Sequence, residues 1–223
     1  MRSISAPLIP DGGLSRREFL RLTGLGAATV AAGLPALSEA AGGMATPPES
    51  PRRGGSLRLA NTSDVVSFEP YTVGDNTSIW TSLLLYDQLT RPTADGLRIE
   101  PNLAQSWEIS PDGKTYTFYL RRGVTYHAGS PVTADDAKFG VERAAFAKKS
   151  TWTSLLTALK AMEVVDAYTV RAHLHQPHAA FLSDVALFAT SLYPKTLVEQ
   201  MGRKFWMHPI GSGPFQFQSW KLG

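Results

Sequence analysis

Cysteine is absent from the 223 residues of this chain. Its absence excludes a disulfide framework, metal or iron–sulfur sites held by thiolates, and a cysteine nucleophile. It also removes the lipid-modified cysteine that would tether an exported protein to a membrane, so no lipid anchor is expected.

The chain also lacks a large excess of charge of one sign. Lys and Arg number 22 against 19 Asp and Glu, the net charge is +3, and no run of five like charges occurs. Neither nucleic-acid binding nor a membrane-binding patch is therefore expected. The sequence also lacks a Gly-rich dinucleotide turn, G-x-S-x-G and H-E-x-x-H. These absences argue against an enzyme and against a bound cofactor. With 43% hydrophobic and 18% charged residues, the composition is that of an ordinary globular protein.

The first forty residues follow the three-part layout of an export signal. A basic start, Ser15-Arg16-Arg17-Glu18-Phe19-Leu20, precedes a Gly- and Ala-rich apolar run over 22–34 and a small-residue cleavage site over 38–40. The paired arginines followed by x-Phe-Leu resemble a twin-arginine signal. The apolar run is too short to span a bilayer comfortably. The alternative is an ordinary N-terminal helix that stays on the protein.

Three segments are therefore predicted. Residues 1–40 form a twin-arginine signal peptide, 41–54 a disordered Pro- and Gly-rich tether, and 55–223 the mature domain. The signal predicts passage through the twin-arginine translocase and a periplasmic, soluble product.

Residues 104–124 are predicted to form two strands joined by a tight turn. Proline presets φ for the turn Ser110-Pro111-Asp112-Gly113, and its glycine accepts a positive φ. Apolar side chains alternate with polar ones on both sides of the turn, as in half-buried strands: Trp107, Ile109, Tyr116, Phe118 and Leu120.

The amino-acid sequence of this stretch resembles the signature of the family 5 bacterial solute-binding proteins. It reads A-Q-S-W-E-I-S-P-D-G-K-T-Y-T-F-Y-L-R-R-G-V. These are the oligopeptide-, dipeptide- and nickel-binding group of ABC importers. Further similar stretches lie at 54–60, 126–136, 164–174 and 208–215. Two departures occur: Phe68-Glu69-Pro70 stands where the family has L-D-P, and Ala128 replaces the usual Asp.

The resemblance implies an α/β fold of the periplasmic binding protein type (type II, large peptide-binding cluster), in which two lobes surround a cleft. Residues 55–223 are similar to the N-terminal part of that domain, a first lobe with a mixed sheet. The chain is expected to be truncated before the second lobe.

Periodicity and capping signals predict the remaining elements. Helices are expected from Asn76 or Thr77 to Leu89, from a capping box of Thr133 and Asp136 through Phe146, and over 153–161, 180–190 and from Tyr193 onward. Strands are expected over 55–60, 162–166, 168–174 and 215–220.

The predicted ligand site starts from the loop before the first of these helices. Unpaired N–H groups and the positive dipole end of a helix suit a carboxylate or another polar group. The same residues also cap helices in most proteins, and both roles remain open. The resemblance places this loop and a Gly-Ser-Gly turn at the cleft. The predicted ligand-binding residues are Tyr71, Asp75, Asn76, Thr77, Ser78, Trp80, Gly211, Ser212 and Gly213.

Three histidines lie close together, at 173, 175 and 178. On a continuing strand His173 and His175 would share a face, so a metal site is conceivable. No acidic ligand lies nearby in sequence and Pro177 breaks the strand, so surface imidazoles and no metal are expected. His127 is expected to be structural, with a backbone partner.

The resemblance implies the substrate-binding component of an ABC importer. It would capture a peptide or similar small solute outside the inner membrane and deliver it to permease subunits, acting as a monomer. The alternatives are a nickel- or sugar-type ligand, a non-functional truncated fragment, or a periplasmic enzyme, because twin-arginine export often serves cofactor-loaded enzymes.

Overall fold

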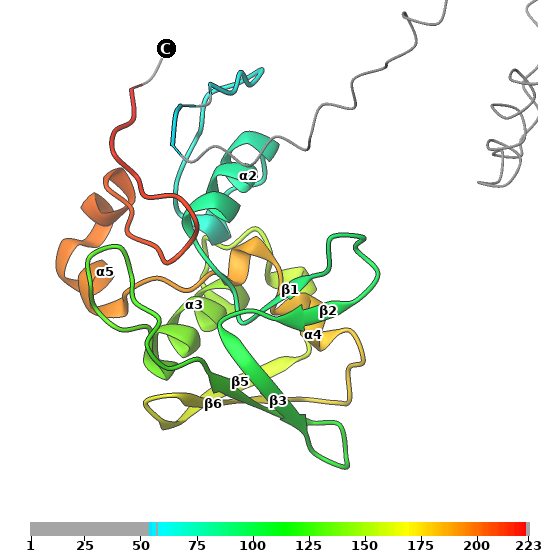
Figure 1. The fold of residues 1–223 in the computed structure, drawn as a ribbon. Coiled ribbons are helices and arrows are strands. Elements are labelled where there is room, and N and C mark those ends of the chain that lie inside the picture. Colours follow the sequence, from blue (N-terminus) through cyan, green and yellow to red (C-terminus); the bar gives the residue numbers. More distant parts are fainter. Residues whose placement is uncertain (1–53, 57, 222–223) are drawn as a thin grey trace, which may run out of the picture. The chain divides into compact units, whose positions relative to one another are not determined.

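The computed structural model of the protein describes residues 54–56 and 58–221. The predicted signal peptide, and the predicted tether apart from its last residue, lie outside the described residues. The chain divides into two units, Met1–Leu57 and Arg58–Gly223, and every helix and strand named below belongs to the second unit (Figure 1).

A four-stranded antiparallel sheet is built from two hairpins in the order β3-β4-β6-β5. Its strands are β3 (Ala104–Ile109), β4 (Thr115–Leu120), β5 (Leu159–Asp166) and β6 (Thr169–Leu174). Both predicted hairpins are confirmed. Gly113 has φ +66°, the positive value expected at the turn between β3 and β4. The two hairpins join where Phe118 on β4 pairs with Val170 on β6.

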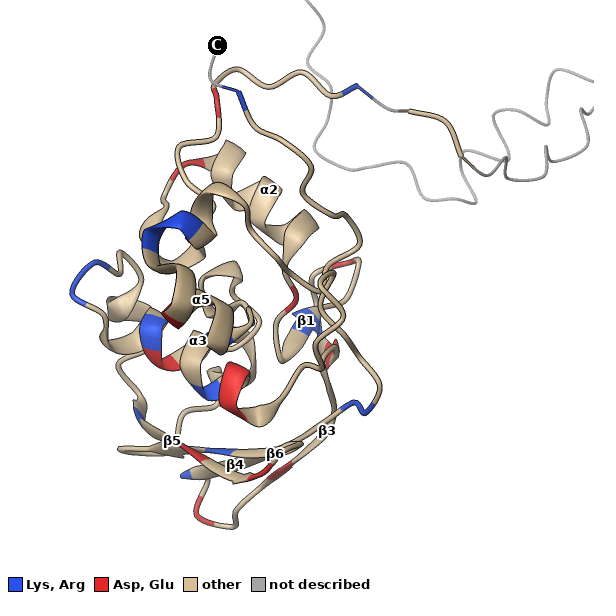
Figure 2. Ribbon diagram, turned by 90° about the vertical axis from the view of Figure 1, so that its left-hand side faces the viewer, with Lys and Arg blue, Asp and Glu red and all other residues tan. Residues whose placement is uncertain are grey.

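The burial of β4 and β6 alternates along each strand, as a half-buried strand requires. The side chains on the inner face are buried: Tyr116, Phe118, Leu120, Val170, Ala172 and Leu174. Figure 2 shows the sheet edge-on, with α3 and α5 on one side of it. A smaller antiparallel sheet pairs β1 (Thr90–Pro92) with β2 (Ile99–Pro101). All strand pairs between 58 and 221 are antiparallel, so the sheet of the described residues is not the mixed sheet that the resemblance predicted.

Helix α3 (Ala134–Phe146) packs on the sheet with a stripe of small side chains. The predicted capping box is confirmed, since Asp136 Oδ2 accepts the backbone N–H of Thr133 at 2.9 Å. Ala137 and Val141 are completely buried, as predicted. Gly140 permits close packing, because a Cβ there would lie 2.3 Å from the carbonyl oxygen of Ser191.

Shorter helices surround this core. The α-helices are α2 (Asn76–Leu85), α4 (Phe181–Asp184) and α5 (Lys195–Met201). The 3₁₀ helices are η1 (Pro70–Thr72), η2 (Thr153–Leu155), η3 (Phe188–Thr190) and η4 (Gly202–Met207). No helix in the described stretches 54–56 and 58–221 is long and apolar enough to cross a membrane.

Several sequence predictions were wrong. Residues 153–161 form only η2 before β5 begins at Leu159, because β5 pairs along the length of β6. The predicted helix over 180–190 is split into α4 and η3, and α2 ends at Leu85, four residues early. Residues 58–60 and 215–220 form no strand, since neither stretch has a strand beside it with which to pair.

Candidate functional site

The loop between η1 and α2 is the centre of the predicted ligand site. Two contacts from the segment after α3 hold it: the indole N–H of Trp152 donates to the Val73 carbonyl at 2.8 Å, and Thr151 N–H donates to the Tyr71 carbonyl at 3.1 Å. Gly74 is exposed, and a Cβ placed on it would meet no atom within 4 Å. The loop therefore presents bare main chain to the solvent.

The first turn of α2 uses most of its polar side chains within the protein. Asp75 is the N-cap, and its Oδ1 accepts the N–H of Ser78 at 2.8 Å. The buried Ser78 hydroxyl accepts Val66 N–H at 2.9 Å, and the Thr77 hydroxyl lies 3.0 Å from that of Ser63. These side chains fasten residues 63–66 to the helix.

Asn76 and Trp80 are the predicted site residues that α2 leaves to the solvent. They lie four positions apart, hence on the same side of the helix. Trp80 is 58% exposed. Beside the helix start lies a hollow of about 500 Å³, lined by Leu59, Asn61, Thr62, Ser63, Asp64, Val65, Thr77 and Trp220. Bare main chain, a free amide and a free indole thus face outward at this end of α2.

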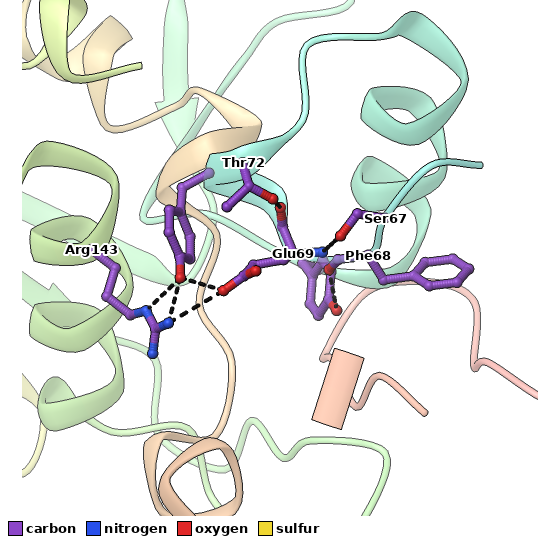
Figure 3. Close-up of polar contacts among 7 residues, drawn as sticks. Ser67, Phe68, Glu69, Thr72 and Arg143 are labelled. Atoms are coloured by element: carbon purple, nitrogen blue, oxygen red, sulfur yellow. Dashed lines mark hydrogen bonds and ion pairs between the residues drawn. The ribbon is translucent and has the colours of Figure 1, made fainter. Parts of the chain in front are cut away.

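Tyr71 supports the loop from inside, and its partners Glu69 and Arg143 are labelled in Figure 3. It is 1% exposed, and its hydroxyl donates to Glu69 Oε1 and accepts from the Arg143 guanidinium. The guanidinium also pairs with Glu69 at 3.3 Å and lies 4.9 Å from the centre of the Tyr71 ring. Burial and the hydrogen bond to Glu69 raise the pKa of Tyr71 to about 12, against the opposing effect of Arg143. The phenol is therefore neutral at physiological pH and fully occupied by protein partners.

The Gly211-Ser212-Gly213 turn packs against the other end of α2. A Cβ at Gly211 would lie 1.8 Å from the Leu85 carbonyl oxygen, so only glycine fits between the two backbones. Gly213 N–H donates to that same carbonyl at 3.0 Å, and the Ser212 hydroxyl donates to Asp87 at 2.9 Å.

The structure does not bring this turn together with the exposed residues of the predicted site. The turn contacts the last residues of α2, whereas Asn76 is the first, and a helix of 10 residues is about 15 Å long. His127 holds the turn in place. Its backbone N–H donates to the Gly211 carbonyl, and its ring Nε2 lies 2.9 Å from the Gly213 carbonyl oxygen. The predicted backbone partner of His127 is thus confirmed.

The three clustered histidines do not converge. His173 Nε2 lies 2.7 Å from Glu163, and His178 Nε2 lies 3.0 Å from Asp184. Both imidazoles are partly exposed. No group of three metal-binding side chains occurs in the part of the chain that the structure describes. Sequence reasoning missed Glu163 because the pairing of β5 with β6 brings it beside His173 from ten residues away.

Trp152 and Arg143 were also missed by sequence reasoning. Trp152 lies 79 positions from Val73 in the loop, and Arg143 lies 72 positions from Tyr71 in η1. No local sequence pattern predicts such a contact. It is seen only in the structure, where α3 and the segment after it pack against η1.

The fold places the chain among the periplasmic binding proteins. It is similar to the ABC transporter-associated periplasmic binding protein DppA from Helicobacter pylori in complex with the peptide STSA, with 30% identity and a TM-score of 0.65. That match covers 72% of this chain and 36% of the other. NikZ from Campylobacter jejuni in complex with Ni(L-His) matches with 30% identity and a TM-score of 0.62, over 71% of this chain and 32% of that one.

The family follows from two further findings. Residues 98–223 match the family model described as bacterial extracellular solute-binding proteins, family 5 Middle. The glutathione-binding protein GsiB of Salmonella choleraesuis is 31% identical over 163 residues, which are 73% of this chain and 32% of that protein. The chain belongs to the bacterial extracellular solute-binding proteins, family 5. The predicted family and fold class are confirmed, and the family is one of binding proteins rather than enzymes. The chain spans about a third of the length of these relatives.

Proposed function

We propose that this chain supplies one wall of the ligand cleft of a solute-binding protein that serves an ABC importer. The observation that carries the proposal is the outward-facing start of α2: the bare loop at Gly74, the amide of Asn76 and the indole of Trp80. The loop is held rigidly by Trp152 and by the Tyr71 cluster, and preorganisation of this kind lowers the entropy cost of binding.

The ligand class that we propose is a peptide or a similar amino-acid-derived solute. Glutathione, the peptide STSA and Ni(L-His), the ligands named for the three relatives above, are all built from amino acids. Such ligands combine amide and charged groups, which main-chain N–H groups and the side-chain amide of Asn76 can bind. A nickel complex remains the second candidate because of the likeness to NikZ.

The proposed mechanism needs no covalent chemistry. The ligand binds against the α2 loop, and a second lobe closes over it, so that binding energy shifts the equilibrium between open and closed states. The closed, loaded protein then delivers the solute to the permease subunits. We further propose export by the twin-arginine route and action as a soluble periplasmic monomer.

A chimera tests the ligand site. Residues 58–221 replace the matching third of the Salmonella glutathione-binding protein, and calorimetry measures binding of glutathione, a tetrapeptide, nickel with histidine, and a disaccharide. We expect the peptides to bind, and a double change of Asn76→Ala and Trp80→Ala to weaken binding at least tenfold. Leu97→Ala, at another exposed apolar side chain, is the matched control. A folded chimera whose affinity is unchanged by the double change would exclude this loop from the ligand site.

A further inference from the structure

The strand β5 lies at one end of the four-stranded sheet, and among the described residues only β6 pairs with it. Figure 2 shows β5 and β3 at opposite ends of the sheet. With eight residues, β5 is the longest strand of this sheet. The main-chain groups on the outer side of an edge strand can pair with a strand of another chain. The outer edge of β5 is therefore a place where a second strand could add.

Two side chains of α3 occupy the main chain in the middle of this edge. Glu142 Oε1 accepts the N–H of Met162 at 3.0 Å, and Lys138 Nζ donates to the Met162 carbonyl at 2.8 Å. These main-chain groups face away from β6, as those of alternate residues in an antiparallel strand do. One side chain thus supplies the acceptor, and the other the donor, that a neighbouring strand would supply.

The helix places both side chains over the edge at once. Lys138 and Glu142 lie four positions apart, hence on the same side of α3, and α3 packs on β5. The ammonium and the carboxylate lie 3.8 Å from each other. Irregular pairing disturbs both ends of the strand, at residues 159–161 and 164–166. The regular part of the edge lies between these irregularities, and its middle is the residue that the two side chains hold.

A hollow of about 500 Å³ lies beside these contacts, between α3 and β5. Charged side chains of both signs and three apolar side chains line it: Asp135, Lys138, Phe139, Glu142, Met162, Glu163, Val164 and Lys195. A strand that added to β5 would displace Lys138 and Glu142 from Met162. Both charged groups would then lose their hydrogen bonds and part of their water, which is unfavourable.

We propose that Lys138 and Glu142 form a side-chain guard that closes the β5 edge to strand addition and keeps copies of this protein apart. Removal of the guard frees the N–H and C=O groups of Met162, and a second copy of β5 then pairs antiparallel with this edge. The proposal goes beyond the proposed function, because it concerns contact between copies of the chain and not the ligand.

The register of the pairing between two copies follows from the strand itself. Pairing about Glu163 sets Met162 of each copy opposite Val164 of the other, and by alternation the main-chain groups of both residues face outward. The two Glu163 carboxylates meet at the centre. Their repulsion is reduced within each copy, where His173 Nε2 lies 2.7 Å and the Arg171 guanidinium 3.9 Å from Glu163.

The test compares full-length chains that carry or lack the guard. The double change Lys138→Ala with Glu142→Ala removes it. Glu142→Gln removes one charge but keeps an amide oxygen that can accept the N–H of Met162. The matched control is Lys148→Ala with Glu199→Ala, which removes one Lys and one Glu at exposed positions elsewhere.

Hydrogen exchange and sedimentation velocity are measured at low and high protein concentration. At low concentration the N–H of Met162 should exchange about tenfold faster in the double-alanine variant than in the wild type, because it has lost its hydrogen-bond acceptor. At high concentration this variant should form a dimer, and exchange over 161–164 should slow again. Glu142→Gln and the matched control should behave as the wild type does.

Circular dichroism checks that each variant folds, and Glu142→Ala alone replaces the double variant if the latter does not. Faster exchange of Met162 followed by a dimer protected at β5 supports the proposal. Exchange of Met162 at the wild-type rate overturns it, and so does a folded guardless variant that stays monomeric. A dimer whose protection lies outside β5, or equal dimerisation of the matched control, also overturns it.

Discussion

Arg143 illustrates how much of this molecule depends on contacts between residues that are distant in sequence. It lies 72 positions from Tyr71, yet its guanidinium contacts both the Tyr71 hydroxyl and the Glu69 carboxylate. The three groups are partly or fully removed from water and satisfy one another, so η1 is fastened to α3. This cluster therefore also helps to fix the position of the loop that follows η1.

The pKa of Tyr71 is raised from 10.0 to about 12, which predicts how the stability of the protein depends on pH. Because the folded-state pKa is above the unfolded one, the stabilising contribution of the neutral phenol is complete below pH 10 and is lost as pH rises to about 12. We expect the urea midpoint of the wild type to fall more steeply over this window than that of Tyr71→Phe. Burial also raises the pKa values of Tyr86 and Tyr126, so the variant retains part of the fall. Parallel curves would contradict the assignment.

A second prediction concerns Asp136, whose carboxylate accepts backbone N–H groups from Thr133 and from Lys195, both at 2.9 Å. Asp136→Ala removes the N3 carboxylate of the α3 capping box and leaves these donors unpaired, so the free energy of unfolding should fall by roughly 2–4 kcal/mol. Asp135→Ala is the matched control. Its carboxylate is mostly exposed and 3.9 Å from Lys195 Nζ, and the loss should stay below about 0.5 kcal/mol. Urea unfolding of the two variants measures the difference, and equal losses would contradict the prediction.

At the scale of elements, α2 connects the predicted ligand loop with the Gly-Ser-Gly turn. Its first turn is capped by Asp75, and its last carbonyls, those of Leu84 and Leu85, accept N–H groups from residues 213 and 215. The two glycines of the turn therefore serve the end of a helix, because their backbone must approach it closely.

The prediction at this scale is that Gly211→Ala displaces the turn from α2. Since the added Cβ would lie 1.8 Å from the Leu85 carbonyl oxygen, the free energy of unfolding should fall by about 3 kcal/mol. Gly74→Ala is the control, because a Cβ there meets nothing within 4 Å. Thermal unfolding followed by circular dichroism compares the two. A Gly211→Ala protein as stable as the control would show that the turn can move away at no cost.

At the scale of the whole molecule, the chain spans about a third of the length of its family 5 relatives. The paired arginines at 16 and 17 lie outside the described residues, and the proposed twin-arginine export depends on them. Replacing both by lysine should leave uncleaved precursor in the cytoplasm, because the twin-arginine translocase reads the arginine pair. Cell fractionation with mass measurement of the product checks this. Normal export and cleavage of the double variant would exclude the twin-arginine route.

The sequence by itself determined what depends on neighbours along the chain. The hairpin over 104–124, the second hairpin and the capping box of Thr133 with Asp136 were all predicted correctly. Each follows from the alternation of apolar and polar residues, from turn chemistry or from a helix cap within a few residues. The same local sequence motifs identified the family. The ligand-site residues were predicted from those motifs, and their role stays a prediction.

Tertiary structure decided the rest. Pairing with β6 extended β5 back to Leu159, which overrode the helix predicted over 153–161. Packing also joined Tyr71 to Arg143 and set Gly211 against Leu85, at the end of α2 remote from Asn76. Strands at 58–60 and 215–220 did not form, because a strand is stabilised by hydrogen bonds to a neighbouring strand and none lies beside these residues. Such contacts join residues far apart in the chain, so no local pattern encodes them.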